Sequence, residues 1–81
     1  MNRVLPITKA GMGATQSEWF RRDLLRAHKA LGPRAARIFI VTVLIADRNG
    51  VVPMDPQAIA DAANAHGATI DEVLARTIGQ A

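Results

Sequence analysis

Residues 38–46 form the most apolar stretch of this 81-residue chain, and only Thr42 interrupts it. A membrane-spanning helix needs roughly 20 such residues, so this run is too short to cross a bilayer. A chain of this length holds a single hydrophobic core. The run therefore predicts a buried element of one domain, and we expect no membrane partner.

The conformation of this run is indicated by the residues that precede it. Most of its side chains are β-branched or aromatic, which also suits a buried strand. However, Pro33 follows Gly32, and proline is favoured in the first turn of a helix because it needs no N–H there. The residues after Pro33 are rich in alanine, which favours helix. We therefore favour a helix over 33–46, with a strand as the alternative.

An amphipathic helix is predicted before it, over 15–31. The residues TQSE at 15–18 fit a capping box, in which the Thr15 and Glu18 side chains each accept from the other residue's amide. Gly32 can take the left-handed conformation that ends many helices. Apolar residues recur at helical spacing on the expected inner face: Phe20, Leu24, Ala27 and Leu31. The expected outer face is basic, with Arg22, Arg26 and Lys29.

Two more helices are predicted after a turn at 47–50 and a short extended segment at 51–52. Asp55 and Pro56 form an N-cap and first-turn pair, and Gly67 should close that helix with a positive φ. Residues 69–72, TIDE, fit a second capping box. The expected inner residues of the third helix are Ile59, Ala62, Ala63 and His66. Those of the last helix are Ile70, Val73, Leu74 and Ile78.

Residues 1–14 include Pro6, Gly11 and Gly13 and show neither helical nor alternating periodicity. We expect a flexible N-terminal arm there and a single helical domain over 15–81. The predicted fold class is a small all-α domain of about four helices, with one short β segment. The N-terminus lacks the apolar stretch of a signal peptide, and there is no cysteine for the disulfides of small secreted domains. We therefore expect a cytoplasmic protein.

Charge is distributed unevenly along the chain. Residues 1–48 hold nine Lys and Arg against three Asp and Glu, whereas residues 49–81 hold one Arg against four acids. The basic half predicts an anionic partner. Neighbours on one helix face stand about 5–6 Å apart, close enough to follow a phosphate backbone. A solvated face that keeps a small protein soluble is the alternative interpretation.

The histidines and carboxylates, which could act in catalysis or bind a metal, do not have the sequence spacing that either role requires. His28 and His66 have no second His or carboxylate at the spacing of a metal site. Asp71 and Glu72 diverge by about 100° on a helix and cannot face each other as an acid–base pair. The GMG at 11–13 is not followed by the Lys-Ser/Thr of a phosphate loop. We therefore expect no enzyme, no metal and no cofactor.

Residues 59–78 resemble a bacterial helix-turn-helix. That pattern has a small residue four positions before the turn glycine and a branched apolar residue six positions after it, as with Ala63, Gly67 and Val73. The preceding stretch, 37–53, looks like the first helix and short strand of winged-helix regulators. The resemblance implies a helix-turn-helix over about 56–78 in a DNA-binding transcriptional regulator that acts as a homodimer.

This interpretation selects eight candidate DNA contacts. Six phosphate contacts are expected on the first helix and at the entry to the second: Arg21, Arg22, Arg26, Lys29, Arg34 and Arg37. Thr69 and Arg76 are the expected base or backbone contacts of the last helix. A chain this short also gains buried surface by self-association, so we expect a homo-oligomer.

The alternative function is a helical protein-interaction module, either an adaptor or an inhibitor of a larger assembly. It would use the acidic C-terminal surface, where Asp71 and Glu72 are adjacent. Two carboxylates at that position oppose binding to phosphates. Salt-dependent DNA binding would separate the two functions.

Overall fold

The computed structural model describes residues 2–4, 15–47, 51–53 and 55–79. Four helices and two short strands follow one another in this part of the chain: β1 (Asn2–Val4), α1 (Glu18–Leu31), α2 (Pro33–Ile45), β2 (Val51–Pro53), α3 (Pro56–Ala65) and α4 (Gly67–Thr77). The predicted fold class, a small all-α domain of about four helices, is confirmed.

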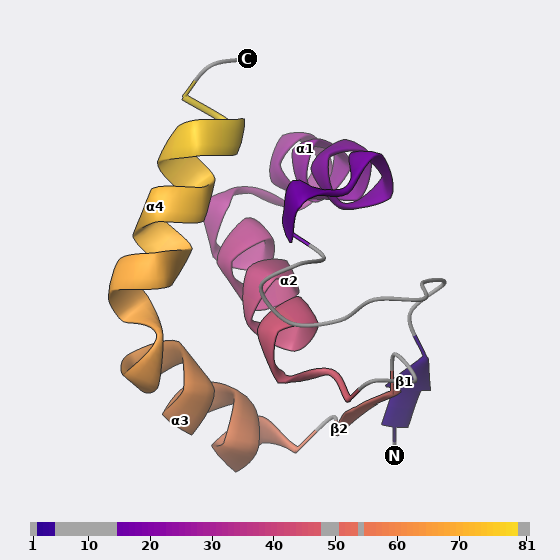
Figure 1. The fold of residues 1–81 in the computed structure, drawn as a ribbon, viewed down its shortest axis with the longest axis vertical. Helices are drawn as coiled ribbons and strands as arrows, with labels where there is room; N and C mark the ends of the chain where they lie inside the picture. Colours follow the sequence, from indigo (N-terminus) through magenta and orange to yellow (C-terminus); the bar gives the residue numbers. More distant parts are fainter. Residues whose placement is uncertain (1, 5–14, 48–50, 54, 80–81) are drawn as a thin grey trace.

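Helix α2 is the central element, with α1 on one side and α3 and α4 on the other (Figure 1). Pro33 is its first residue, as predicted, and the apolar run is helical as far as Ile45. Six residues of α2 are buried: Ala36, Phe39, Ile40, Val41, Thr42 and Val43. The Thr42 hydroxyl satisfies itself locally by donating to the Phe39 carbonyl oxygen at 2.7 Å. A helix so widely apolar must be covered by other elements.

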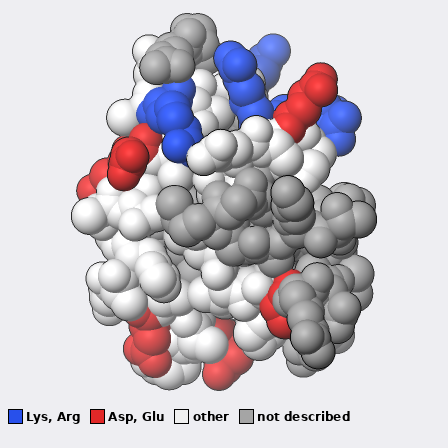
Figure 2. Space-filling model, in the orientation of Figure 1, with Lys and Arg blue, Asp and Glu red and all other residues white. Residues whose placement is uncertain are grey.

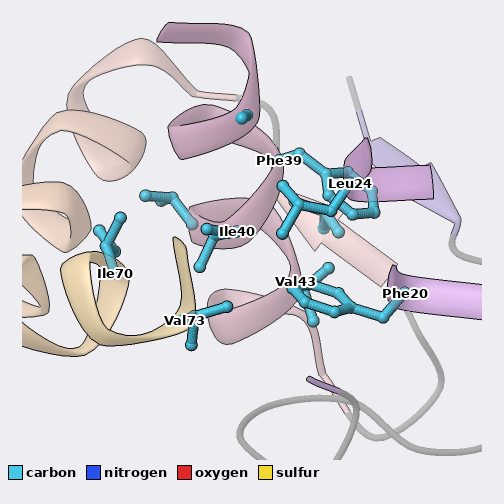
Figure 3. Close-up of a cluster of buried hydrophobic side chains, with 10 residues drawn as sticks. Phe20, Leu24, Phe39, Ile40, Val43, Ile70 and Val73 are labelled. Atoms are coloured by element: carbon cyan, nitrogen blue, oxygen red, sulfur yellow. The ribbon is translucent and has the colours of Figure 1, made fainter. Parts of the chain in front are cut away.

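The core has two halves, one on each side of α2 (Figure 3). Between α1 and α2 lie Phe20, Leu24, Phe39 and Val43. Between α2 and α4 lie Ile40, Ile70 and Val73. None of these side chains is more than 9% exposed. Because α2 contributes to both halves, its side chains set the positions of α1 and α4 together.

Three aromatic rings pack in the α1 half of the core. Phe20 and Phe39 stack with ring centroids 5.4 Å apart. Trp19 meets each of them edge-on, at 6.0 and 6.4 Å. Such pairs contribute about 0.5–1.5 kcal/mol each beyond the area that they bury. Packing within the chain therefore accounts for both neighbouring aromatic residues of α1.

Two predicted helix starts are wrong. Helix α1 begins at Glu18 with Ser17 as its N-cap, and Thr15 lies in the 3₁₀ turn before it. Thr15 is buried and accepts from Arg76 of α4. Helix α4 begins at Gly67, because its hydrogen-bond ladder already starts with the Ile70 amide and the His66 carbonyl oxygen. Residues 69–72 therefore lie inside the helix and form no capping box.

The link between α3 and α4 is a single residue, His66, with φ −112° and ψ 21°. The prediction that Gly67 closes α3 with a positive φ is wrong, since Gly67 is helical. Among the described residues, only Gly32 has a positive φ, at 94°. A Cβ added to Gly67 would meet no heavy atom within 4 Å. The turn depends on a conformation that non-glycine residues adopt, so it does not require this glycine.

Two side chains expected on inner faces point to solvent. Leu31 is 77% exposed, because it is the last residue of α1 and the chain turns away at Gly32. His66 is exposed at the link. The remaining inner residues predicted for α3 and α4 pack on or within the core.

The two strands pair antiparallel, with Arg3 opposite Val52. Asn2–Val4, within the predicted flexible arm, thus form a strand, while residues 5–14 lie outside the described part. Val52 is fully buried, and β1 supplies the backbone partner that a strand edge needs. Before β2, Asp47 bonds to Val51 through its backbone amide and its carboxylate, each at 3.0 Å. Residues 48–50 of the predicted turn are outside the described residues.

Two leucines of α1 test the position of the core. Leu24→Ala should lower the free energy of unfolding by about 2–5 kcal/mol, because it leaves a cavity. Leu31→Ala should change it by no more than about 0.5 kcal/mol, since Leu31 is exposed. Urea unfolding followed by circular dichroism measures both. Equal losses would contradict the placement of Leu31 outside the core.

Two glycines test the turns. Gly32→Ala should destabilise by about 1–3 kcal/mol, because its backbone conformation disfavours any Cβ. Gly67→Ala should be neutral or stabilise by up to about 1 kcal/mol, because alanine restricts the unfolded chain and fits a helix. Thermal unfolding of the two variants gives the comparison. If Gly67→Ala destabilises the protein, the result would support a positive φ at Gly67 and contradict the helical conformation described here.

Candidate nucleic-acid interface

Several exposed cations of the described residues lie at one end of the molecule. Figure 2 shows Lys and Arg there, over α1 and the C-terminal end of α4, with acidic side chains both beside them and at the opposite end, over α3. Five residues make up what we call the basic end: Arg21, Arg22, Arg26, Lys29 and Arg76. All five were among the residues predicted from the sequence.

Helix α1 supplies four of these cations because its apolar face is buried. Phe20 and Leu24 enter the core, so residues on the opposite side of the helix point to solvent. Arg22, Arg26 and Lys29 are exposed there. Residues three or four apart on a helix stand about 5–6 Å apart. The three cations therefore form a row along α1, as the sequence predicts.

Arg76 joins the basic end from α4. Its Nη2 donates to the carbonyl oxygen and the hydroxyl of Thr15, both at a long 3.4 Å. These contacts show that the last turn of α4 lies beside the start of α1. There Arg21 and Arg76 line a polar hollow of about 610 Å³ with Ser17 and Glu18. Sequence periodicity could not predict that Arg76 lies beside the start of α1, because that contact depends on how two helices distant in the sequence pack.

The basic end keeps most of its positive charge. Asp23 lies 3.4 Å from the Arg22 side chain and pairs with it. Glu18 is the other carboxylate of α1 and makes no ion pair with a described cation. An exposed pair such as Arg22–Asp23 contributes at most about 1 kcal/mol. Even Arg22 can therefore exchange its partner for a phosphate at little cost.

Arg34 and Arg37 lie elsewhere, along a groove of about 530 Å³ between α2 and α3. The Arg37 guanidinium donates to the Asp71 carboxylate of α4. Its charge is thus compensated within the fold. Arg34 is exposed and has no ion pair among the described residues. The structure therefore separates these two predicted phosphate contacts from the four on α1.

The first turns of α4 present carboxylates instead of base-contacting groups. Thr69 is half-buried, whereas Asp71 and Glu72 are exposed. The second helix of a DNA-binding helix-turn-helix enters the major groove with its N-terminal residues. Two carboxylates near phosphates oppose that approach. Helix α4 is therefore poorly suited to contact bases through Thr69.

The described residues hold neither a cluster of metal ligands nor a long apolar helix. Nowhere in them do three His, Cys, Asp or Glu side chains come together as a metal site requires. His28 is half-buried on α1, and His66 is exposed. None of the described helices combines the length and the apolar character that crossing a membrane demands.

The Arg37–Asp71 pair should couple α2 to α4 weakly. The side chains are 42% and 69% exposed, so a double-mutant cycle with alanine should give a coupling of about 0.2–1 kcal/mol. Urea unfolding of the four proteins measures it. Arg34→Ala combined with Asp71→Ala is the matched control and should show no coupling. Absence of coupling for Arg37 would contradict the ion pair.

Comparisons with protein-family models, curated proteins and solved structures find no match for this chain. The function proposed for it therefore depends on the charge and geometry of the described residues.

Proposed function

We propose that this protein binds DNA through its basic end, by contacts to the phosphate backbone. One observation carries the proposal. Four exposed cations lie along α1, Arg21 among them shares a hollow with Arg76 of α4, and only Arg22 among the five has a carboxylate partner in the described part. A surface with that excess of positive charge attracts a polyanion. Exposed arginines contribute little to the stability of a fold, so folding does not explain why they cluster.

The length of the cationic row fits a DNA strand. Arg22 and Lys29 lie seven residues apart on α1, which is about 10 Å along a helix with a rise of 1.5 Å per residue. A strand of B-DNA carries one phosphate per about 3.4 Å of helix axis. The row therefore spans roughly three phosphates, and Arg21 and Arg76 add two cations beside it.

The affinity should come mainly from counterion release. Each neutralised phosphate contributes about 0.9 to the slope of log affinity against log salt. If all five cations contact phosphates, the slope is about −4 to −5. Binding of this kind carries no sequence information directly. We therefore propose that α1 positions the protein on the duplex and that α4 makes no base contacts.

The wider role that we propose is a cytoplasmic transcriptional regulator, acting as a homodimer. This role rests on the sequence resemblance of Ala63, Gly67 and Val73 to the spacing of a helix-turn-helix, not on the geometry of α3 and α4. The single-residue link at His66 is shorter than the three- to four-residue turn of that motif. Phosphate contact through α1 needs neither a second copy nor a helix-turn-helix.

Removing cations from α1 tests the proposal. Arg21→Ala and Lys29→Ala should each make the slope of log affinity against log salt shallower by about 0.9, and together by about 1.8. Neither cation has a described ion pair, so stability should change by less than about 0.5 kcal/mol. Fluorescence anisotropy with a mixed-sequence duplex at several salt concentrations gives the slope.

Arg34→Ala is the matched control, because it removes the same charge outside the basic end. Its slope should equal that of the unmodified protein. Equal losses in all three variants would mean that net charge alone governs binding. No salt-dependent binding by the unmodified protein at about 50 mM salt, where the electrostatic contribution is strong, would exclude DNA as the partner.

A further inference from the structure

The free face of α2 is an apolar trough between α1 and α3. Two large apolar side chains of the described part are exposed, Leu31 at 77% and Ile38 at 42%. Ile38 lines two adjoining grooves, one of about 600 Å³ against α1 and one of about 530 Å³ against α3. We call these two grooves the α2 trough. Its apolar lining includes Leu31, Ala35, Ile38, Ile59, Ala60 and Ala63.

Folding alone does not account for this surface. The buried residues of α2 serve the halves of the core against α1 and α4, whereas Ile38 is exposed between its neighbours. Contiguous apolar surface rimmed by polar residues is a form that protein interaction sites take. The trough has α2 at its base and α1 and α3 at its sides. Apolar grooves of this kind bind the apolar face of an amphipathic helix.

Arginines surround the apolar lining. Arg26 lines the α1 side, and Arg34 and Arg37 line the α3 side. Arg26 and Arg34 have no ion pair in the described part of the chain, while Arg37 pairs with Asp71. Asp23 also lines the α1 side, but Arg22 already pairs with it. The rim of the trough therefore has a positive charge that an acidic partner would complement.

We propose that the α2 trough binds an amphipathic helix of a partner protein, with its apolar stripe on Ile38 and its flanking Asp and Glu on Arg26 and Arg34. A DNA backbone supplies negative charge but no apolar surface to cover Leu31 and Ile38. A second copy docked symmetrically through the same trough supplies apolar surface, but it would also bring a second Arg26 and Arg34 to the same rim. Of these three occupants, the acidic amphipathic helix satisfies both the lining and the rim.

The partner surface thus differs from the acidic C-terminal surface that the sequence suggested for protein binding. Asp71 is already engaged with Arg37 across α2 and α4. The trough shares Arg26 with the basic end, and its other lining residues lie outside that end. This proposal does not depend on DNA binding.

A labelled synthetic peptide tests the proposal on the full chain. The probe is a helix of about five turns, with Leu at positions i, i+3, i+4 and i+7 and Glu on both flanks. The full chain should bind it, and a peptide with Lys in place of Glu should bind at least about ten-fold more weakly. Ile38→Ser and Arg34→Glu should each weaken binding of the Glu peptide by at least about ten-fold.

Arg21→Glu is the matched control, because it reverses a charge outside the trough. It should leave peptide binding within about two-fold while weakening DNA binding, so the two proposals fail separately. Circular dichroism establishes that each variant is folded. If Ile38→Ser loses structure, Arg34→Glu still tests the rim.

Three results would overturn the proposal. One is equal binding of the Glu and Lys peptides. Another is no binding of the Glu peptide by the folded protein at about 1 mM, the weak end of measurable affinity. The third is self-association in sedimentation equilibrium that Ile38→Ser abolishes, because a second copy would then occupy the trough.

Discussion

Burial of α2 is the interaction on which the rest of this structure depends. Fully burying one Leu, Ile, Val or Phe side chain contributes about 1.5–3 kcal/mol, and α2 supplies five of the buried apolar residues. No other described element contributes as many. Helix α1 covers it through Phe20 and Leu24, and α4 covers it through Ile70 and Val73. Because both helices pack on the same central one, their outer surfaces are held in a defined relation. The basic end is a consequence of that relation.

The described arginines and Lys29 of α1 and α2 therefore divide between two surfaces. Those on the outer face of α1 meet Arg76 and form a charged surface, with most of the cations unpaired in the described part. Arg34 lies beside apolar side chains of α2 and α3. A phosphate backbone suits the first environment, and an acidic amphipathic helix suits the second. Positive charge attracts either partner. The apolar side chains beside that charge decide which of the two partners each surface fits.

The α3–α4 pair has the residue spacing of a helix-turn-helix without the exposed side chains that contact DNA in that motif. Ala63 and Val73 pack against or within the core, as a helix-turn-helix requires. Yet the exposed N-terminal part of α4 offers carboxylates, and Asp71 is tied to Arg37 of α2. Small and branched apolar residues at those spacings serve close packing of any two helices. What makes such a pair contact DNA is the chemistry of its exposed side chains.

The sequence by itself determined the four helices, the buried run of α2 and the basic outer face of α1. Those features depend on local properties: the conformational preference of Pro33, the helical period of apolar residues, and the exposure of cations opposite that period. Only the tertiary structure decided the contacts between distant residues. Arg76 reaches Thr15, β1 pairs with β2, and Arg37 pairs with Asp71 away from the basic end. Each of these contacts depends on how the elements pack around α2, and no local sequence pattern predicts that packing.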